Sequence, residues 1–282
     1  MPVTVTTLGT GNPLPDPHRA GPSTLVVAGD TRVLIDAGRG VLMRLTAAGV
    51  LPIMLDAVLL THLHSDHITD LNDVVTSQWV MSQTPTTLHV YGPPGTRAVV
   101  DGILAMLAPD ISYRLAHHAD LTWSPMVEVH ELVPPQTTTI GATTILVRAT
   151  DHRPVEPTVG YRIEHEGAVV AIAGDTVPCA GLDELCAGAD VYVQTVIRED
   201  LVRLMPNARI QDILDYHSSV EQAAQTAARA GVRTLMCTHY VPALQPGQHD
   251  GWRSSITDHF HGEVVLADDL TSITIEGSTP AG

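Results

Sequence analysis

The segment THLHSDH gathers three histidines and one aspartate within six positions. It follows the apolar run AVLL, which is typical of a buried strand. Because side chains two residues apart share one side of a strand, we expect His62 and His64 to face one metal ion. Asp66 and His67 lie on the following turn and can face a second ion. Imidazole and carboxylate ligands together suit zinc and other borderline metals.

Three more ligand-type residues follow predicted strands further along the chain. His152 comes after a strand expected at Thr143–Ala149, Asp175 after the apolar run VVAIAG, and His239 after TLMC. Each has an ordinary explanation by itself, as a loop histidine, a turn aspartate or a buried core histidine. Taken as an ordered set with THLHSDH, they favour a shared metal centre.

THLHSDH resembles the His-x-His-x-Asp-His motif of the metallo-β-lactamase superfamily, and the resemblance extends from LGTGNP near the N-terminus to His239. It implies an α/β fold, the αβ/βα sandwich of two mixed β-sheets flanked by helices. It also implies two Zn²⁺ ions per chain with Asp175 bridging them. The implied ligands are His62, His64 and His152 for one ion, and Asp66, His67 and His239 for the other.

Three motifs are similar to those of the ribonuclease Z group: LGTGNP, the GDT around Asp175, and YHSSVEQAA. The resemblance makes His217 an acid-type catalytic histidine, and Asp66 a ligand that also accepts the proton of water. Two features depart from the group. Gln194 and Thr195 stand where it has a His-Glu pair, so the carboxylate partner of His217 is missing. Only EHEGAVVAIA separates GYRI from GDT, so the long tRNA-binding arm is missing too.

The resemblance therefore implies a di-zinc hydrolase similar to the arylsulfatase and small phosphodiesterase branch. It would cleave phosphodiester, or related sulfate and acyl, esters by a metal-bound hydroxide. The alternative is ribonuclease Z itself, the endonuclease of the tRNA 3′ end. A formal net charge of −16 disfavours tRNA, since phosphate neutralisation dominates nucleic-acid binding. We expect a small anionic ester as substrate. A pseudoenzyme serving as an interaction module is disfavoured by the seven intact ligands.

Aromatic residues lie more often in a core than at a cleft, so the sequence gives only candidates for the side chains that line the substrate cleft. The candidates for its walls are Trp79, Met81, Trp123, His117 and His118, and those for attracting an anion are Arg19 and Arg153.

The elements that must position these residues are many short strands and few helices. Strands are expected at 3–8, 23–27, 32–37, 56–61, 127–132, 143–149, 159–164, 168–173, 191–195 and 234–237, with a strand and then a turn over 87–95. Helices are expected at 40–49, 70–81, 96–107 and 218–231. Each half of the chain passes from strands to strand–helix alternation, which indicates two packed sheets with helices outside. We expect one domain over 1–276 and a flexible tail over 277–282.

The composition of the chain indicates the size of its core and its cellular location. Apolar residues make up 44% of the chain, enough for a large core with few aromatic side chains. Three cysteines without close pairing predict free thiols in a reducing compartment. Neither a signal peptide nor a membrane span is apparent. We therefore expect a cytoplasmic protein with no membrane partner, and a homodimer, as in many members of the superfamily.

Overall fold

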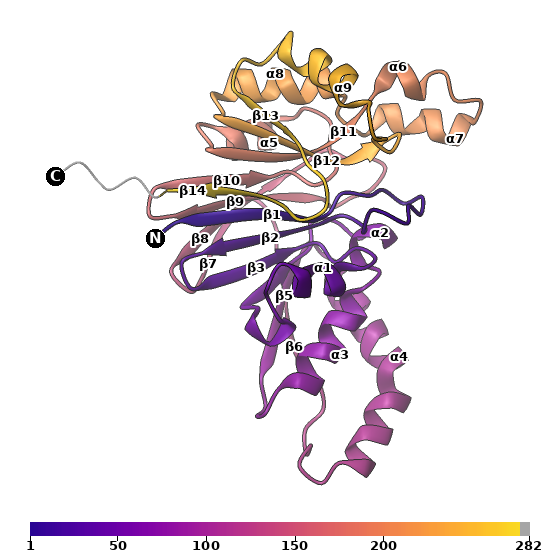
Figure 1. Ribbon diagram of the computed structural model, residues 1–282. Helices are drawn as coiled ribbons and strands as arrows, with labels where there is room; N and C mark the ends of the chain where they lie inside the picture. Colours follow the sequence, from indigo (N-terminus) through magenta and orange to yellow (C-terminus); the bar gives the residue numbers. More distant parts are fainter. Residues whose placement is uncertain (277–282) are drawn as a thin grey trace, which may run out of the picture.

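The computed structural model describes residues 1–276, and the tail predicted for 277–282 lies outside the described residues. Two β-sheets pack face to face, and helices cover the outer face of each (Figure 1). This is the predicted αβ/βα sandwich, with the N-terminal half of the chain forming most of one sheet.

The first sheet has the strand order β14-β1-β2-β3-β4-β5-β6. Its strands are β1 (Val3–Gly9), β2 (Ser23–Ala28), β3 (Thr31–Ile35), β4 (Ala57–Leu59), β5 (Thr87–Gly92), β6 (Met126–Glu131) and β14 (Thr271–Ile275). Pairing is antiparallel from β14 to β3 and parallel from β3 to β6, so the sheet is mixed. The helices beside it are α1 (Val41–Ala47), α2 (Ser65–Ile68), α3 (Leu71–Met81) and α4 (Thr96–His117), with a 3₁₀ turn η1 (Pro52–Met54).

The second sheet has the order β13-β12-β11-β10-β9-β8-β7. Its strands are β7 (Gln136–Ile140), β8 (Thr143–Ala149), β9 (Val159–His165), β10 (Ala168–Ile172), β11 (Val191–Ile197), β12 (Thr234–Val241) and β13 (Glu263–Leu266). Its helices are α5 (Ala180–Cys186), α6 (Glu199–Val202), α7 (Ala208–Gln211), α8 (Val220–Ala230) and α9 (His249–Thr257), with a 3₁₀ turn η2 (Asp212–Asp215). The central parallel strands β11 and β12 are buried on both faces, and apolar residues predominate in both, as is typical of strands covered on two sides.

The main core lies between the two sheets and consists largely of aliphatic side chains, as the low aromatic content predicts. Tyr161 of β9 is fully buried there, and its hydroxyl donates a 2.6 Å hydrogen bond to the carbonyl of Leu60 at the end of β4. This bond ties the second sheet to the start of the histidine-rich segment in the first.

Several boundaries differ from the prediction. Helix α4 continues ten residues past Leu107 and includes Pro109. A proline removes one backbone hydrogen bond from a helix, but Arg114 and Asp110 pair at 2.8 Å in the following turn and support its continuation. Strands β7, β13 and β14 and helices α2, α5, α6, α7 and α9 were not predicted, and each of them has at most nine residues.

The missing arm is confirmed. β9 and β10 form a hairpin closed by Glu166 and Gly167, both with positive φ, as the tight turns of hairpins require. Within residues 1–276, no helix combines the length and the apolar character that a membrane crossing requires.

Candidate metal centre and cleft

The predicted ligands converge at one edge of the sandwich, where the carboxyl ends of four strands lie. His62 and His64 follow β4, and His152 follows β8. Asp175 follows β10, and His239 lies near the end of β12. The topology thus places residues from both halves of the chain around one point.

The strand argument for His62 and His64 is wrong, although their convergence is observed. β4 ends at Leu59, and the two histidines lie on the loop that follows it. Nε2 of His62 is 3.1 Å from Nδ1 of His64. Asp66 and His67 lie on the single turn of α2 rather than on an irregular turn.

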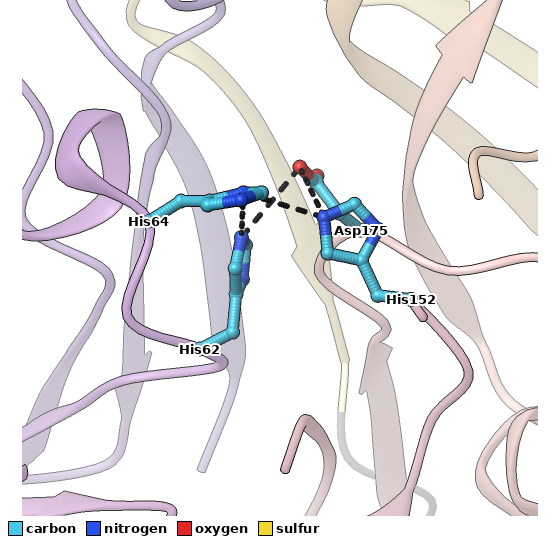
Figure 2. Close-up of side chains that lie close together, drawn as sticks. All are labelled: His62, His64, His152 and Asp175. Atoms are coloured by element: carbon cyan, nitrogen blue, oxygen red, sulfur yellow. Dashed lines mark hydrogen bonds and ion pairs between the residues drawn. The ribbon is translucent and has the colours of Figure 1, made fainter. Parts of the chain in front are cut away.

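His62, His64, His152 and Asp175 form the first group of possible ligands (Figure 2). Nε2 of His152 lies 3.3 Å from Nδ1 of His64, and Oδ2 of Asp175 lies 3.8 Å from Nε2 of His62. Tetrahedral ligand atoms about 2.0–2.1 Å from a zinc ion are about 3.3 Å apart. The three imidazoles therefore have the spacing of ligands to one ion.

Asp66, His67 and His239 form the second group. Oδ2 of Asp66 lies 3.2 Å from Nε2 of His239 and 3.8 Å from Nε2 of His67. Oδ2 of Asp175 is 3.4 Å from Nε2 of His67 and 3.7 Å from Nε2 of His239. The same Asp175 oxygen thus adjoins both groups, which is the position of a bridging carboxylate.

Hydrogen bonds from outside the ligand set orient several imidazole rings. Asp36, at the end of β3, accepts hydrogen bonds from Nδ1 of His67 and from the amide and hydroxyl of Thr61, all at 2.8 Å. Nδ1 of His152 donates to the carbonyl of Tyr216 at 2.8 Å. Such partners fix the tautomer and leave Nε2 for a metal ion. Asp36 and His239 both have positive φ, a rare conformation that concentrates at functional sites.

Thr195 has a different partner from the one that the sequence suggested. Its hydroxyl donates to Oδ1 of Asp175 at 2.7 Å in a buried setting. His217 instead donates from Nδ1 to the carbonyl of Ile213 at 3.1 Å. The residue that stands where a carboxylate was expected therefore orients Asp175, and a backbone carbonyl orients His217.

Electrostatics of the centre favour a cation. Burial lowers the pKa of His62 well below its ordinary value and lowers the pKa of His152 to about 4, so both imidazoles are in the neutral form that binds metal. Burial would raise the pKa of Asp175, but His239 and His67 hold it well below its usual value. Asp175 in turn raises the pKa of His67 and of His239 against the effect of their burial. A buried ionised carboxylate requires a nearby positive charge, and a divalent ion would supply it in place of the protons on these two imidazoles.

The residues also pass a test of fit for metal ions. Nε2 of His67 is buried and has no hydrogen-bond partner, and it points between Oδ2 of Asp66 and Oδ2 of Asp175. An orphaned polar atom of this kind is costly unless something satisfies it. A metal ion among these nitrogen and carboxylate donors would do so.

The metal groups open into a cleft of about 210 Å³. His217 lies on its wall, with Nε2 3.3 Å from Oδ2 of Asp175. Pro13, Leu14 and Ile213 give the cleft an apolar side, and Arg209 of α7 adds a guanidinium. The arrangement suits an anionic group at the metals and an apolar or flat group beside it.

The residues predicted to line the cleft are wrong. None of Trp79, Met81, Trp123, His117, His118, Arg19 and Arg153 lines it. Trp79 is buried and donates from Nε1 to the carbonyl of Trp123 at 2.8 Å. Arg19 pairs with Asp268, and Arg153 pairs with Asp151, so both charges are already balanced.

Asp36 and Arg209 were missed from sequence. Asp36 carried a usable signal, since it is a carboxylate directly after the apolar strand β3 and shortly before Gly38. Arg209 carried none, because its place in the cleft depends on how the segment before His217 folds back over the metal groups.

Comparisons with known proteins agree with this geometry. The model of the β-lactamase superfamily domain matches residues 31–240. A protein of Mycolicibacterium paratuberculosis named ribonuclease Z is 55% identical over 276 residues, covering 97% of this chain and 99% of that protein. A ribonuclease Z of Mycolicibacterium gilvum is 54% identical over 285 residues, covering 99% and 100%.

Solved structures share the fold. The metallo-β-lactamase fold protein YhfI of Bacillus subtilis has a TM-score of 0.76 at 24% identity, covering 97% of this chain and 99% of its own. The short form of human tRNase Z has a TM-score of 0.70 at 22% identity, covering 98% and 100%. Together with the full-length matches above 50% identity, these results show that the chain belongs to the ribonuclease Z family of the metallo-β-lactamase superfamily.

Proposed function

We propose that this protein is a zinc-dependent endonuclease that matures the 3′ end of tRNA precursors. The observation that carries the proposal is the 55% identity to a protein named ribonuclease Z over 97% of the chain. The comparisons thus favour the predicted alternative over a small-ester hydrolase. None of the relatives named above is an arylsulfatase, and that part of the prediction gains no support.

The missing arm no longer argues against this function. The alignment with the paratuberculosis ribonuclease Z has 276 positions and covers 97% of this chain and 99% of that protein. A long insertion therefore has no room in that relative either. A chain without an arm is compatible with the name.

The proposed ligands are His62, His64 and His152 for one zinc ion and Asp66, His67 and His239 for the other, with Asp175 shared. Two bound zinc ions would polarise a phosphoryl oxygen and make a water molecule nucleophilic at neutral pH. The match of donor chemistry and spacing to tetrahedral sites supports two ions.

The chain's own residues supply positioning and proton transfer. Burial would raise the pKa of Asp66, but the hydrogen bond from His239 lowers it, so its carboxylate is ionised and can accept a proton from water. His217 presents Nε2 to the cleft because its Nδ1 is bonded to the Ile213 carbonyl. In the imidazolium form it can donate from Nε2 to the leaving oxygen.

A second candidate function has two observations in its favour. The chain has 31 acidic and 15 basic side chains, and an acidic protein gains little from counterion release on RNA. The cleft of about 210 Å³ also suits a small phosphodiester. Such an ester is the second candidate substrate.

The deciding experiment compares kcat/KM for a tRNA precursor and for a bis-aryl phosphate with the same zinc-loaded protein. The proposal expects efficient cleavage of the precursor, and Asp175→Ala as the control should lose activity on both substrates. Hydrolysis of the bis-aryl phosphate with the precursor left intact would transfer the proposal to the small ester.

Three further expectations accompany this function. A cytoplasmic setting is supported by the free thiols of Cys179, Cys186 and Cys237. The homodimer stays a prediction, to be measured by light scattering. The single domain over 1–276 also stays a prediction, for which one cooperative unfolding transition is expected.

A further inference from the structure

A separate cluster of ligand-type side chains lies on β5 and β6, outside the proposed catalytic centre. It consists of His89, Glu128 and His130. In the parallel register His89 pairs with Glu128, and Tyr91 pairs with His130. Residues two apart on a strand share a face, so all four side chains lie on the same face of the first sheet.

The ligand atoms of this cluster form a compact triangle. Nδ1 of His89 lies 3.2 Å from Nε2 of His130 and 3.5 Å from Oε2 of Glu128. Nε2 of His130 lies 3.7 Å from Oε1 of Glu128. These separations bracket the distance of about 3.3 Å between ligands of a tetrahedral zinc ion.

Hydrogen bonding and metal binding are alternative arrangements of this triangle. Nδ1 of His89 faces both a nitrogen of His130 and an oxygen of Glu128, and one ring nitrogen carries at most one proton to share between them. A cation at the centre of the triangle would satisfy the three groups at once.

The surroundings hold one ligand in place and leave the site open. The ring of Tyr91 stacks on that of His130, with centroids 4.3 Å apart and an interplanar angle of 15°. The side chains of His89 and Glu128 are 40% and 58% exposed. An ion from solvent can therefore reach the cluster and keep a fourth position for water or another ligand.

We propose that His89, Glu128 and His130 bind a divalent zinc ion in addition to those of the catalytic centre. Two imidazoles and one carboxylate with an open fourth position are a ligand set that zinc accepts in proteins. β6 is the edge strand of the first sheet. The ion would tie this edge to β5, and exposed edges are where sheets need protection.

The test measures bound zinc by equilibrium dialysis of the full chain against a buffered series of free Zn²⁺. His130→Asn and Glu128→Gln remove one ligand each from exposed or half-exposed positions. His117→Asn, at the exposed end of α4, is the matched control. We expect both ligand variants to saturate with one zinc fewer than the wild type, while His117→Asn binds as many as the wild type.

The measured quantity is the difference in bound zinc between the variants and the wild type. This difference does not depend on which substrate the protein cleaves. Retained hydrolytic activity in both ligand variants would show that the lost ion is not a catalytic one. If either variant binds as much zinc as the wild type, with unchanged affinity, the cluster is a surface ion pair and the site is refuted.

Discussion

Thr195→Val removes one hydroxyl from the centre and keeps the volume of the side chain nearly constant. The hydroxyl donates to Oδ1 of Asp175 at 2.7 Å, and both residues are buried. A hydrogen bond to a charged group contributes about 1.5–3 kcal/mol. At about 1.4 kcal/mol per factor of ten, its loss should weaken metal binding about 10- to 100-fold, the range known for partners that orient ligands.

The assay is competition for zinc between the protein and a chelator of known affinity at fixed pH. Because Asp175 adjoins both ligand groups, the affinity of both ions should fall. Thr195→Ser keeps the hydroxyl and should recover most of the affinity. Equal affinity in Thr195→Val and wild type would refute the orienting role, and an equal loss in Thr195→Ser would trace the effect to packing.

Three further changes test other contacts of the site. Asp36→Asn should lower zinc affinity about 10- to 100-fold in the same chelator assay, because it disturbs the partner of His67; unchanged affinity would contradict this. His217→Ala should slow turnover about 10- to 100-fold at constant zinc content; a rate equal to wild type would remove its catalytic role. Tyr161→Phe should lower the free energy of unfolding by about 1–3 kcal/mol, since the Leu60 carbonyl loses its buried donor; a denaturation curve that matches wild type would show this bond to be neutral.

The convergence of these histidines and aspartates could be predicted from sequence, because each residue lies in a motif or shortly after an apolar strand. THLHSDH supplies four of them within one loop and one helical turn. His152, Asp175 and His239 follow strands whose apolar residues are easily recognised. These strands belong to both sheets and end at the same edge of the sandwich, so the convergence depends on how the two sheets pack.

The partners of these ligands could not be predicted, because they depend on contacts between segments far apart in sequence. Asp36 reaches His67 across 31 positions, and Thr195 reaches Asp175 across 20. Thr195 aligns with a catalytic carboxylate of the ribonuclease Z group, and this alignment suggested that it lies beside His217. The wall of the cleft was mispredicted for a related reason. The indole of Trp79 donates to the carbonyl of Trp123, 44 positions away in the loop before β6, and does not face the cleft.

We propose that this site cuts a tRNA precursor at one defined place. To test this, a labelled precursor is incubated with the zinc-loaded protein alone, and the new 3′ end is mapped. We predict a single product ending after the discriminator base, formed by the wild type and lost in Asp175→Ala. An intact precursor, or cuts scattered along the RNA, would contradict the proposed function.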